Sequence, residues 1–405
     1  MATLKTEFAG LQLKNPFIVA SSELTNTLEK IQLAEKAGAA AVSTKLCFLQ
    51  VPFWAKPYHK VEDRTIFFSP SGDRMSVEDA QRLVEAAKKT TDIKIIANMM
   101  GPSDVEGWGV LAKKLEDAGA DMIEMNMSCP NIGLHAKQIG ATQAGGAAGA
   151  SLGQNPELSE AVSRAASSAV KIPVMAKLTP EGPTAIMAGA CAKGGVAAVS
   201  AINCPQSLPS PDIYHGGRPT YTNTSNMSFA GLCGPAIRPL AYRHVAQIRT
   251  KNPDIKIAGG GGLMTWQHCV DMIMYGADVL TFCVLFYLKG FRVIKNLEEG
   301  MLKFMEEQGY ENIGQMRDLA LKYIVTPDKV NYSNCIPKVD QSKCTGCGSC
   351  VNMSQCMIFE QGADKKAVVT REKECYGCGV CYWTCPAKAI SMVNEDGTVI
   401  TPPAK

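Results

Sequence analysis

The sequence has little net charge and no long apolar run, and each absence excludes a class of protein. Among 405 residues, 41 Lys and Arg stand against 38 Asp and Glu, a net charge of +3. This excess is too small to indicate a nucleic-acid or membrane-surface partner. The most apolar stretch, Val279 to Leu288, is shorter than a bilayer span and is interrupted by Thr281 and Cys283. The opening residues MATLKTEF lack the apolar core of a signal peptide. We therefore expect a cytoplasmic protein without nucleic-acid or membrane partners.

Cysteine is the residue that the sequence has in excess. There are 16 in all, and eight of them lie between Cys344 and Cys385. A secreted disulfide scaffold would be short and rich in cysteine throughout, so this clustering indicates metal ligation. At roughly 100–200 residues per domain, the length indicates two or three domains, or one large barrel and a small module.

Short apolar runs alternate with amphipathic segments through the first 290 residues, and eight of these runs predict strands. They are Pro16–Ser21, Ala39–Lys45, Lys94–Met100, Asp121–Ser128, Pro173–Leu178, Ala197–Asn203, Lys256–Gly260 and Asp278–Cys283. Strands that alternate with helices and are apolar on both faces form a parallel sheet. Eight such units predict an α/β fold of the closed (β/α)8 TIM-barrel type. An open doubly wound sheet is the alternative, but it would need a Gly-x-Gly-x-x-Gly turn where Ala20–Thr25 reads ASSELT.

Helices and loops complete this division of the chain. Asp104–Ala118 and Pro156–Val170 are the clearest amphipathic helices, and Glu298–Gln308 predicts another. The long loops Cys47–Ser76 and Pro205–Ala236 follow the second and sixth strands, on the face where barrels build active sites. We expect a barrel over residues 1–300, a helical linker over 301–338 and a small α+β domain over 339–405.

The clustered cysteines form two runs with the same spacing. Cys-x2-Cys-x2-Cys occurs at 344, 347 and 350 and again at 375, 378 and 381. A fourth cysteine follows each run, at 356 and 385. The pattern resembles bacterial two-cluster ferredoxins, in which the fourth cysteine of one run ligates the other cluster. The resemblance implies two [4Fe-4S] clusters, one held by Cys344, Cys347, Cys350 and Cys385, the other by Cys375, Cys378, Cys381 and Cys356.

Three details bear on this assignment. Structural zinc pairs two Cys-x2-Cys knuckles, so a third cysteine in both runs disfavours it. Gly346, Gly348, Gly377 and Gly379 let the backbone wrap close to the cluster sulfurs. Cys356 departs from the pattern, because five residues precede it and no proline follows, and Cys335 is a spare thiol just before the module.

Several barrel segments resemble the flavin-dependent dihydroorotate and dihydropyrimidine dehydrogenases. Asn126–Asn131 (NMSCPN) is close to that family's Asn-x-Ser-Cys-Pro turn, and Met175–Pro180 (MAKLTP) matches its fifth-strand motif with a flavin-contacting lysine. Gly231–Pro239 (GLCGPAIRP) resembles a stretch around the flavin, and Gly259–Gly262 ends the strand where the family binds the flavin phosphate. The two-cluster module is shared specifically with dihydropyrimidine dehydrogenases, so barrel and module together match their iron–sulfur subunit.

The resemblance implies FMN and a set of residues around it. Expected flavin contacts are Ser21, Thr44, Lys45, Asn98, Asn126, Lys177, Asn203, Gly231, Gly260, Gly261, Phe282 and Cys283. Expected substrate contacts are Asn126, Ser128, Asn203 and Cys204. The chemistry of the residues agrees, because successive glycines suit a phosphate and a lysine at a buried strand end needs an anion such as reduced flavin.

Cys129 is the expected catalytic acid. A hydride delivered from flavin N5 to one carbon of an activated double bond requires a proton on the neighbouring carbon. A thiol with a pKa near ~8.5 is protonated at neutral pH and can supply it. The alternative is that Cys129 is a buried cysteine with a purely structural role. In the oxidative direction the same residue would act as a thiolate, so activity would rise with pH.

One part of the resemblance is missing. The pyrimidine-reducing enzymes carry an Asn-x-Glu signature in the loop after the second strand, and Ser69–Glu78 here reads SPSGDRMSVE. Either other groups such as Arg74 or Glu78 hold the ring, or the substrate is not a pyrimidine.

Three functions therefore remain open. The first is reduction of uracil or thymine to the 5,6-dihydro form. The second keeps the mechanism but takes a non-pyrimidine conjugated acid, amide or thioester. The third is an electron-transfer subunit of a larger complex. Because the chain has no dinucleotide fingerprint, we expect a FAD/NAD(P)H-binding donor subunit or a ferredoxin as partner, in a homo- or hetero-oligomer.

Overall fold

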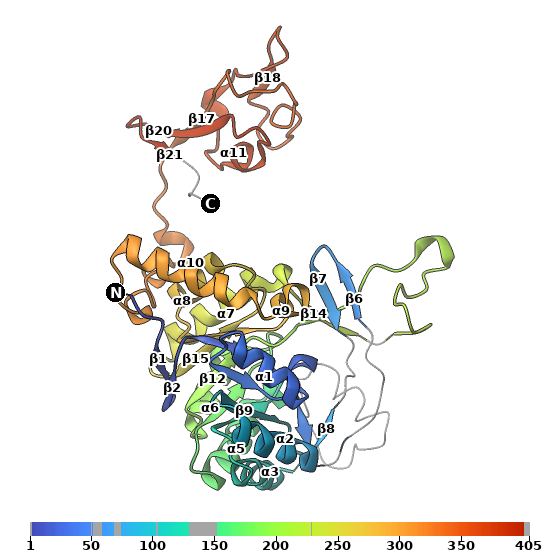
Figure 1. Cartoon of the computed structure of the whole chain (residues 1–405). Helices are drawn as coiled ribbons and strands as arrows, with labels where there is room; N and C mark the ends of the chain where they lie inside the picture. Colours follow the sequence, from blue (N-terminus) through green and yellow to red (C-terminus); the bar gives the residue numbers. More distant parts are fainter. Residues whose placement is uncertain are drawn as a thin grey trace. The chain divides into compact units, whose positions relative to one another are not determined.

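The fold was analysed in a computed structural model, which describes residues 2–49, 51, 59–68, 74–102, 104–128, 152–227 and 229–400. The chain divides into two compact units, Met1–Ile324 and Val325–Lys405. Each is described by itself below (Figure 1). Across the described part of the chain, the helices are too short or too polar to cross a bilayer.

The first unit is a closed barrel of eight parallel strands. Neighbours around the ring pair in the order β3, β4, β9, β10, β11, β12, β15 and β16, and β16 pairs with β3 to close it. The strands are β3 (Phe17–Val19), β4 (Ala41–Ser43), β9 (Lys94–Met99), β10 (Met122–Asn126), β11 (Val174–Lys177), β12 (Ala198–Ala201), β15 (Lys256–Gly260) and β16 (Val279–Phe282). Each lies within one of the eight predicted runs, so the predicted TIM barrel is confirmed.

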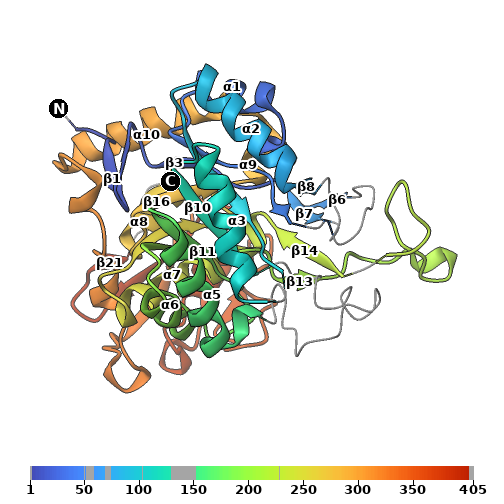
Figure 2. The same ribbon diagram turned by 90° about the horizontal axis from the view of Figure 1, so that it is seen from below.

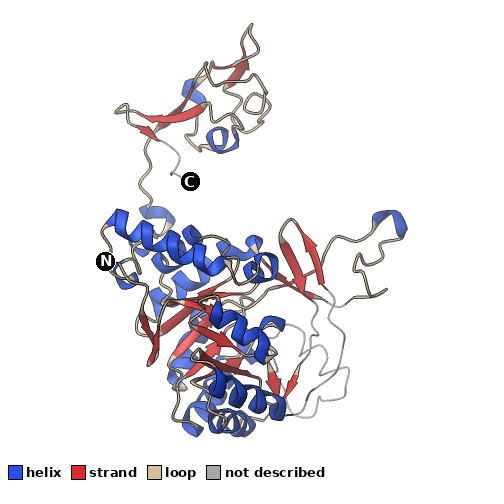
Figure 3. Ribbon diagram, in the orientation of Figure 1, coloured by secondary structure: helices blue, strands red, loops and turns tan. Residues whose placement is uncertain are grey.

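Helices surround the strands on the outside (Figure 3). They are α1 (Leu28–Lys36), α2 (Val77–Thr90), α3 (Glu106–Asp117), α5 (Pro156–Ala169), α6 (Thr184–Lys193), α7 (Arg238–Lys251), α8 (Trp266–Met274), α9 (Val284–Lys289) and α10 (Val293–Gln308). Side-chain oxygens cap the N-termini of four of them, from Thr27, Ser76, Asn155 and Thr265. Four helices are followed by a glycine with positive φ before the next strand, a conformation that commonly ends helices. These glycines are Gly38, Gly119, Gly195 and Gly276.

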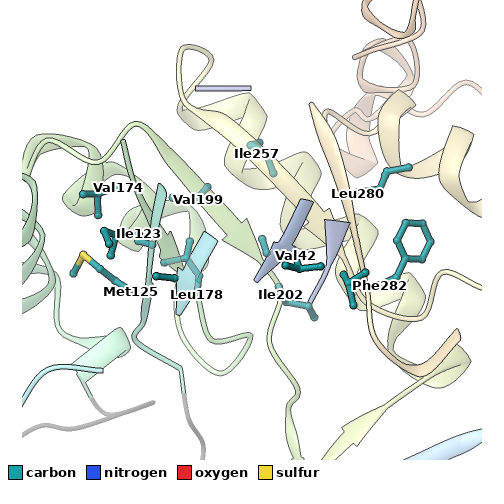
Figure 4. Close-up of a cluster of buried hydrophobic side chains, with 14 of the residues drawn as sticks. Val42, Ile123, Met125, Val174, Leu178, Val199, Ile202, Ile257, Leu280 and Phe282 are labelled. Atoms are coloured by element: carbon teal, nitrogen blue, oxygen red, sulfur yellow. The ribbon is translucent and has the colours of Figure 1, made fainter. Parts of the chain in front are cut away.

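The main core fills the space between the strands and this outer ring of helices. Buried side chains such as Val42, Ile123, Val199 and Ile257 project from successive strands into it (Figure 4). Each such side chain, fully buried, stabilises the fold by roughly 1.5–3 kcal/mol. α10 belongs to the same core through Ile294, Leu297, Met301 and Met305.

The inside of the barrel changes from apolar to polar along its axis. At the N-terminal ends of the strands lies an apolar layer, closed from below by the hairpin of β1 (Thr6–Phe8) and β2 (Leu11–Leu13). Its strand residues are Ile18, Ala41, Ile96, Met122, Met175, Ala198, Ala258 and Val279. Because side chains alternate along a strand, the residue two positions later faces the same interior. Those residues are Ala20, Ser43, Asn98, Glu124, Lys177, Ser200, Gly260 and Thr281. The polar end of the barrel is therefore the end where the strands finish.

The two long loops pair with each other beside this end. β6 (His59–Glu62) and β7 (Thr65–Phe68) come from the first loop, and β13 (Gln206–Ser207) and β14 (Ala230–Cys233) come from the second. They form one antiparallel sheet in the order β13-β14-β7-β6, and β6, β7 and β14 lie side by side in Figures 1 and 2. The short strands β5 (Cys47–Phe48) and β8 (Met75–Ser76) extend the barrel sheet beyond β9.

The second unit is a small α+β domain. β17 (Cys335–Val339), β20 (Ile390–Asn394) and β21 (Val399–Ile400) form one antiparallel sheet, and β18 (Phe359–Gln361) pairs with β19 (Ala367–Val369). The single-turn helix α11 (Val380–Thr384) packs against β20. The core of this second unit contains Ile358, Phe359, Ile390 and Met392, and several cysteines pack against that core.

Candidate active site

A pocket opens at the C-terminal ends of the barrel strands. It encloses about 1170 Å³, including its open mouth. Strand-end residues line it, namely Ala20, Ser21, Ser22, Lys45, Asn126, Lys177, Ser200, Ile202, Asn203, Gly261, Gly262, Thr281, Phe282 and Cys283. Phe68, Cys233 and Gly234, from the sheet formed by the two long loops, also line it. The pocket is therefore built by the polar end of the barrel and by both predicted functional loops.

Lys177 is the last residue of β11, and its side chain faces this pocket. It is only 9% exposed, yet its ammonium group takes part in none of the hydrogen bonds or ion pairs of the residues that the structure describes. Because the side chain lines the pocket, its positive charge favours an anion bound there. A flavin ring that is negatively charged when reduced fits this requirement.

Lys45, which follows β4, is instead neutralised by a carboxylate that the sequence analysis missed. Its Nζ lies 2.7 Å from Glu23 Oε1, and the side chains are 12% and 21% exposed. Tyr287 donates its hydroxyl to the other Glu23 oxygen. Burial alone would raise the pKa of Glu23, but the charge of Lys45 and the hydrogen bonds from Lys45 and Tyr287 outweigh it and lower that pKa to about 2. Glu23 is therefore a fixed negative charge in the pocket wall.

Two asparagines at the ends of β10 and after β12 are held by one serine. Asn126 Oδ1 accepts hydrogen bonds from the backbone N–H and the hydroxyl of Ser128. Asn203 Nδ2 donates to Ser128 Oγ at 2.7 Å and to its carbonyl oxygen at 3.2 Å. Ser128 is fully buried and does not line the pocket. Its position shows an orienting role, because it fixes two amides that do line the pocket.

A glycine-lined wall lies where β15 ends and α7 begins. Gly234, Gly261 and Gly262 line the pocket, and all three have positive φ. A Cβ at Gly262 would lie 2.5 Å from the carbonyl oxygen of Gly234 and 2.9 Å from the backbone nitrogen of Arg238, the first residue of α7. Exposed backbone near a helix N-terminus suits a phosphate. The other two glycines of the run have packing roles, since a Cβ at Gly260 would strike Thr281.

Not every expected flavin contact reaches the pocket wall. Thr44 and Asn98 are buried beside each other, and Thr44 Oγ1 accepts a hydrogen bond from the Asn98 backbone. Asn98 and Ser43 donate to the carboxylate of Glu124 inside the barrel. Thr44 and Asn98 do not line the pocket, so they have the role of supporting residues.

Two further expected residues have specific placements. Gly231 lies in β14, where a Cβ would lie 3.0 Å from Cys204 Cβ. Cys204 lines the pocket, but its sulfur is bonded to Cys233 in a disulfide. Cys129, the expected acid, lies outside the described residues, directly after Ser128.

The cysteines of the second unit gather in the two sets expected from their spacing. Cys344, Cys347, Cys350 and Cys385 together line one small hollow. In the other set, Cys381 is within electrostatic range of Cys375, Cys378 and Cys356, and Cys356 and Cys375 line a common hollow. Cys335 is adjacent to this second set, since its carbonyl oxygen accepts from Cys375 Sγ at 3.8 Å.

The cysteines of each set lie around a hollow rather than around a single point. Within the described ranges, no three His, Cys, Asp or Glu side chains converge as ligands of a single metal ion do. A [4Fe-4S] cluster is ligated at separate irons, so its four cysteines enclose a cage rather than meet at a point. Gly346, Gly348, Gly377 and Gly379 have φ values of 71°, 75°, 68° and 72°. The two runs thus share one backbone conformation that favours glycine.

Comparison with known proteins identifies the barrel. The family model described as dihydroorotate dehydrogenase matches residues 72–305. The chain belongs to the dihydroorotate dehydrogenase family. It is 30% identical over 360 residues to the NAD-dependent dihydropyrimidine dehydrogenase subunit PreA of Escherichia coli (strain K12), covering 86% of this chain and 84% of that one.

Dihydroorotate dehydrogenase B subunits show a comparable sequence identity. The chain is 33% identical over 326 residues to the dihydroorotate dehydrogenase B (NAD(+)) catalytic subunit of Pyrococcus furiosus, covering 79% of this chain and 99% of that one. The corresponding subunit of Methanocaldococcus jannaschii is 33% identical over 314 residues. The family resemblance drawn from the motifs is confirmed, and this chain is a flavin-dependent oxidoreductase acting on a CH–CH bond.

Sequence reasoning missed Glu23, which lines the pocket, and Tyr287, which donates a hydrogen bond to it. Glu23 follows β3 by four residues and Lys45 follows β4 by two, and these strands are neighbours in the ring. That adjacency was a usable signal for an ion pair, because parallel strands end at the same rim. Tyr287 comes from α9, 264 residues from Glu23 in sequence, and carries no comparable signal.

Proposed function

We propose that this chain uses FMN and two [4Fe-4S] clusters to reduce an activated C=C bond, with electrons passing from the clusters to the flavin. The observation that carries this proposal is the ammonium group of Lys177, which faces the pocket of a dihydroorotate dehydrogenase-family barrel and has no hydrogen-bond or ion-pair partner among the described residues. The same chain carries two separate sets of four cysteines. The division into a barrel over 1–300, a helical linker over 301–338 and a two-cluster domain over 339–405 is part of the proposal.

The residues present fit FMN. Lys177 would neutralise the flavin ring, and the wall of Gly234, Gly261 and Gly262 would hold the phosphate. When bound, FMN supplies hydride transfer at N5. Six further expected flavin contacts line the same pocket, namely Ser21, Lys45, Asn126, Asn203, Phe282 and Cys283.

Cys129 is the proposed proton donor. It follows Ser128, whose hydroxyl and backbone are fixed by Asn126 and Asn203. A thiol can supply the required proton. The two amides line the pocket and would hold the carbonyl or N–H groups of a substrate.

The first substrate proposed is a pyrimidine, uracil or thymine, reduced to its 5,6-dihydro form. Arg74 lines the pocket, whereas Glu78 lies exposed on α2. Of the two groups considered as replacements for the absent Asn-x-Glu signature, only Arg74 is therefore in place. A guanidinium donates hydrogen bonds to both carbonyl and carboxylate oxygens, which keeps a conjugated acid, amide or thioester as the second candidate.

The proposed setting is a cytoplasmic enzyme with a separate electron donor. PreA and the dihydroorotate dehydrogenase B proteins are named as subunits, which supports a FAD/NAD(P)H-binding partner or a ferredoxin and a homo- or hetero-oligomer. A purely electron-transferring role is the remaining alternative, and the experiment below separates it.

The test is anaerobic purification followed by determination of flavin and iron, then a substrate screen. We expect about one FMN and about eight irons per chain, and flavin reoxidation by uracil or thymine, or by an enoyl compound if the second candidate holds. Cys129→Ala should abolish reoxidation by the substrate while dithionite still reduces clusters and flavin. Absence of FMN refutes the proposal, and an unchanged Cys129→Ala enzyme favours the electron-transfer role.

A further inference from the structure

The pocket contains a second redox-competent group besides the flavin that the proposed function places there. Cys204 directly follows the substrate-side residue Asn203, and Cys233 ends β14. Both line the pocket, their Cα atoms are 5.7 Å apart, and their sulfurs are bonded to each other. We propose that Cys204 and Cys233 are a redox-active pair that exchanges two electrons with the flavin.

Among the described cysteines, this is the one bonded pair. The other thirteen form no disulfide; eight of them are the proposed cluster ligands, and the remaining five include buried thiols of the barrel core. A chain that used disulfides as a scaffold would pair cysteines throughout. In a protein whose other thiols stay reduced, a disulfide is typically catalytic or redox-sensing.

The backbone around the pair is held without the disulfide. Leu232 N–H donates to the carbonyl oxygen of Pro205 at 2.8 Å, and β13 and β14 pair through Gln206 with Gly231. On its other edge β14 pairs with β7, where Gly231 lies opposite Phe68. Opening the sulfur–sulfur bond would leave both ladders intact, so the pair can cycle without unfolding its surroundings.

The surroundings also suit the reduced form. Lys177 lines the same pocket, and an ammonium group stabilises the thiolate that forms when a disulfide opens. Gly231 leaves room for Cys204, because a Cβ there would lie 3.0 Å from Cys204 Cβ. The glycine expected as a flavin contact therefore also has a packing reason.

The exchange balances as a two-electron reaction. The sulfur–sulfur bond breaks and each sulfur gains one electron and one proton, while the anionic reduced flavin loses two electrons and the N5 proton. The second proton comes from solvent. The clusters would regenerate reduced flavin one electron at a time, so the pair would store two electrons beside the substrate site.

The inference rests on the proposed function, and an anaerobic reductive titration of the holoenzyme tests it. FMN and two clusters take up about four electrons, and the disulfide raises this to about six. We expect about six for the wild type and about four for Cys204→Ser and for Cys233→Ser. Cys191→Ala, which removes a free core thiol of α6, should stay at about six.

Alkylation before and after reduction, read by mass spectrometry, gives a second measurement on the wild-type enzyme alone. Residues 204 and 233 should be labelled only after reduction. Uptake of about four electrons by a flavin-replete wild type, labelling of both residues in the oxidised enzyme, or a pair that stays unlabelled in the fully reduced enzyme overturns the inference. A preparation without FMN refutes the proposed function instead.

Discussion

Glu23→Gln should destabilise the barrel by an amount that the structure sets. The change removes the counter-charge of Lys45, whose ammonium lies 2.7 Å from Glu23 and is only 12% exposed. A pKa lowered from 4.5 to about 2 corresponds to about 3 kcal/mol at pH 7. With Glu23 21% exposed, we expect solvent screening to leave about 2 kcal/mol in the free energy of unfolding.

The dependence on pH has a definite sign. Because the folded pKa is depressed, the stabilisation is complete above the unfolded value of 4.5 and is lost as pH falls through about 2. The difference between wild type and Glu23→Gln should therefore be constant from pH 6 to 8. At pH 4 it should narrow by about 1 kcal/mol.

Equilibrium urea unfolding, followed by fluorescence of the barrel residues Trp108 and Trp266, measures this difference. Glu307→Gln is the matched control, since Glu307 pairs with Lys303 on the exposed face of α10 and should change stability by less than about 0.5 kcal/mol. The reasoning is refuted if Glu23→Gln is no less stable than Glu307→Gln at pH 7, or if the difference widens at pH 4.

Three further predictions address the clusters, the phosphate wall and the base of the barrel. Cys356→Ser should lose about half of the iron of the wild type, whereas Cys335→Ser should keep all of it. If iron analysis finds the loss in Cys335→Ser instead, Cys335 rather than Cys356 is the cluster ligand. Gly262→Ala should weaken FMN binding at least about tenfold, because the added Cβ would lie 2.5 Å from a backbone oxygen. Gly290 has a similar φ but lies in open space, so Gly290→Ala should keep its flavin affinity. A fluorescence titration with FMN compares the two variants. Asp278→Asn should lower the free energy of unfolding by about 3 kcal/mol without loss of flavin. The reason is that the Asp278 side chain is 2% exposed and lies 2.6 Å from the buried guanidinium of Arg249. An unchanged melting temperature would contradict this.

Local pattern was enough to predict the strands of the barrel. Apolar runs predicted all eight, because each run had to bury both faces between barrel interior and helices. The resemblance of the cysteine spacing to that of two-cluster ferredoxins implied the two four-residue sets, and the structure brings the cysteines together in these sets. Lys177 was expected to contact the flavin from its motif and its place at a strand end, and it lines the pocket.

The tertiary structure decided the contacts between loops and between strand ends. The neutralisation of Lys45 by Glu23 depends on the rim that brings the ends of β3 and β4 together, and Tyr287 reaches that pair from the far end of the barrel sequence. The joining of Cys204 to Cys233 depends on the pairing of β13 with β14, which brings together two residues that are 29 positions apart in the sequence. Sequence periodicity specifies which way a strand faces, but only closure of the barrel specifies which side chains meet at its mouth.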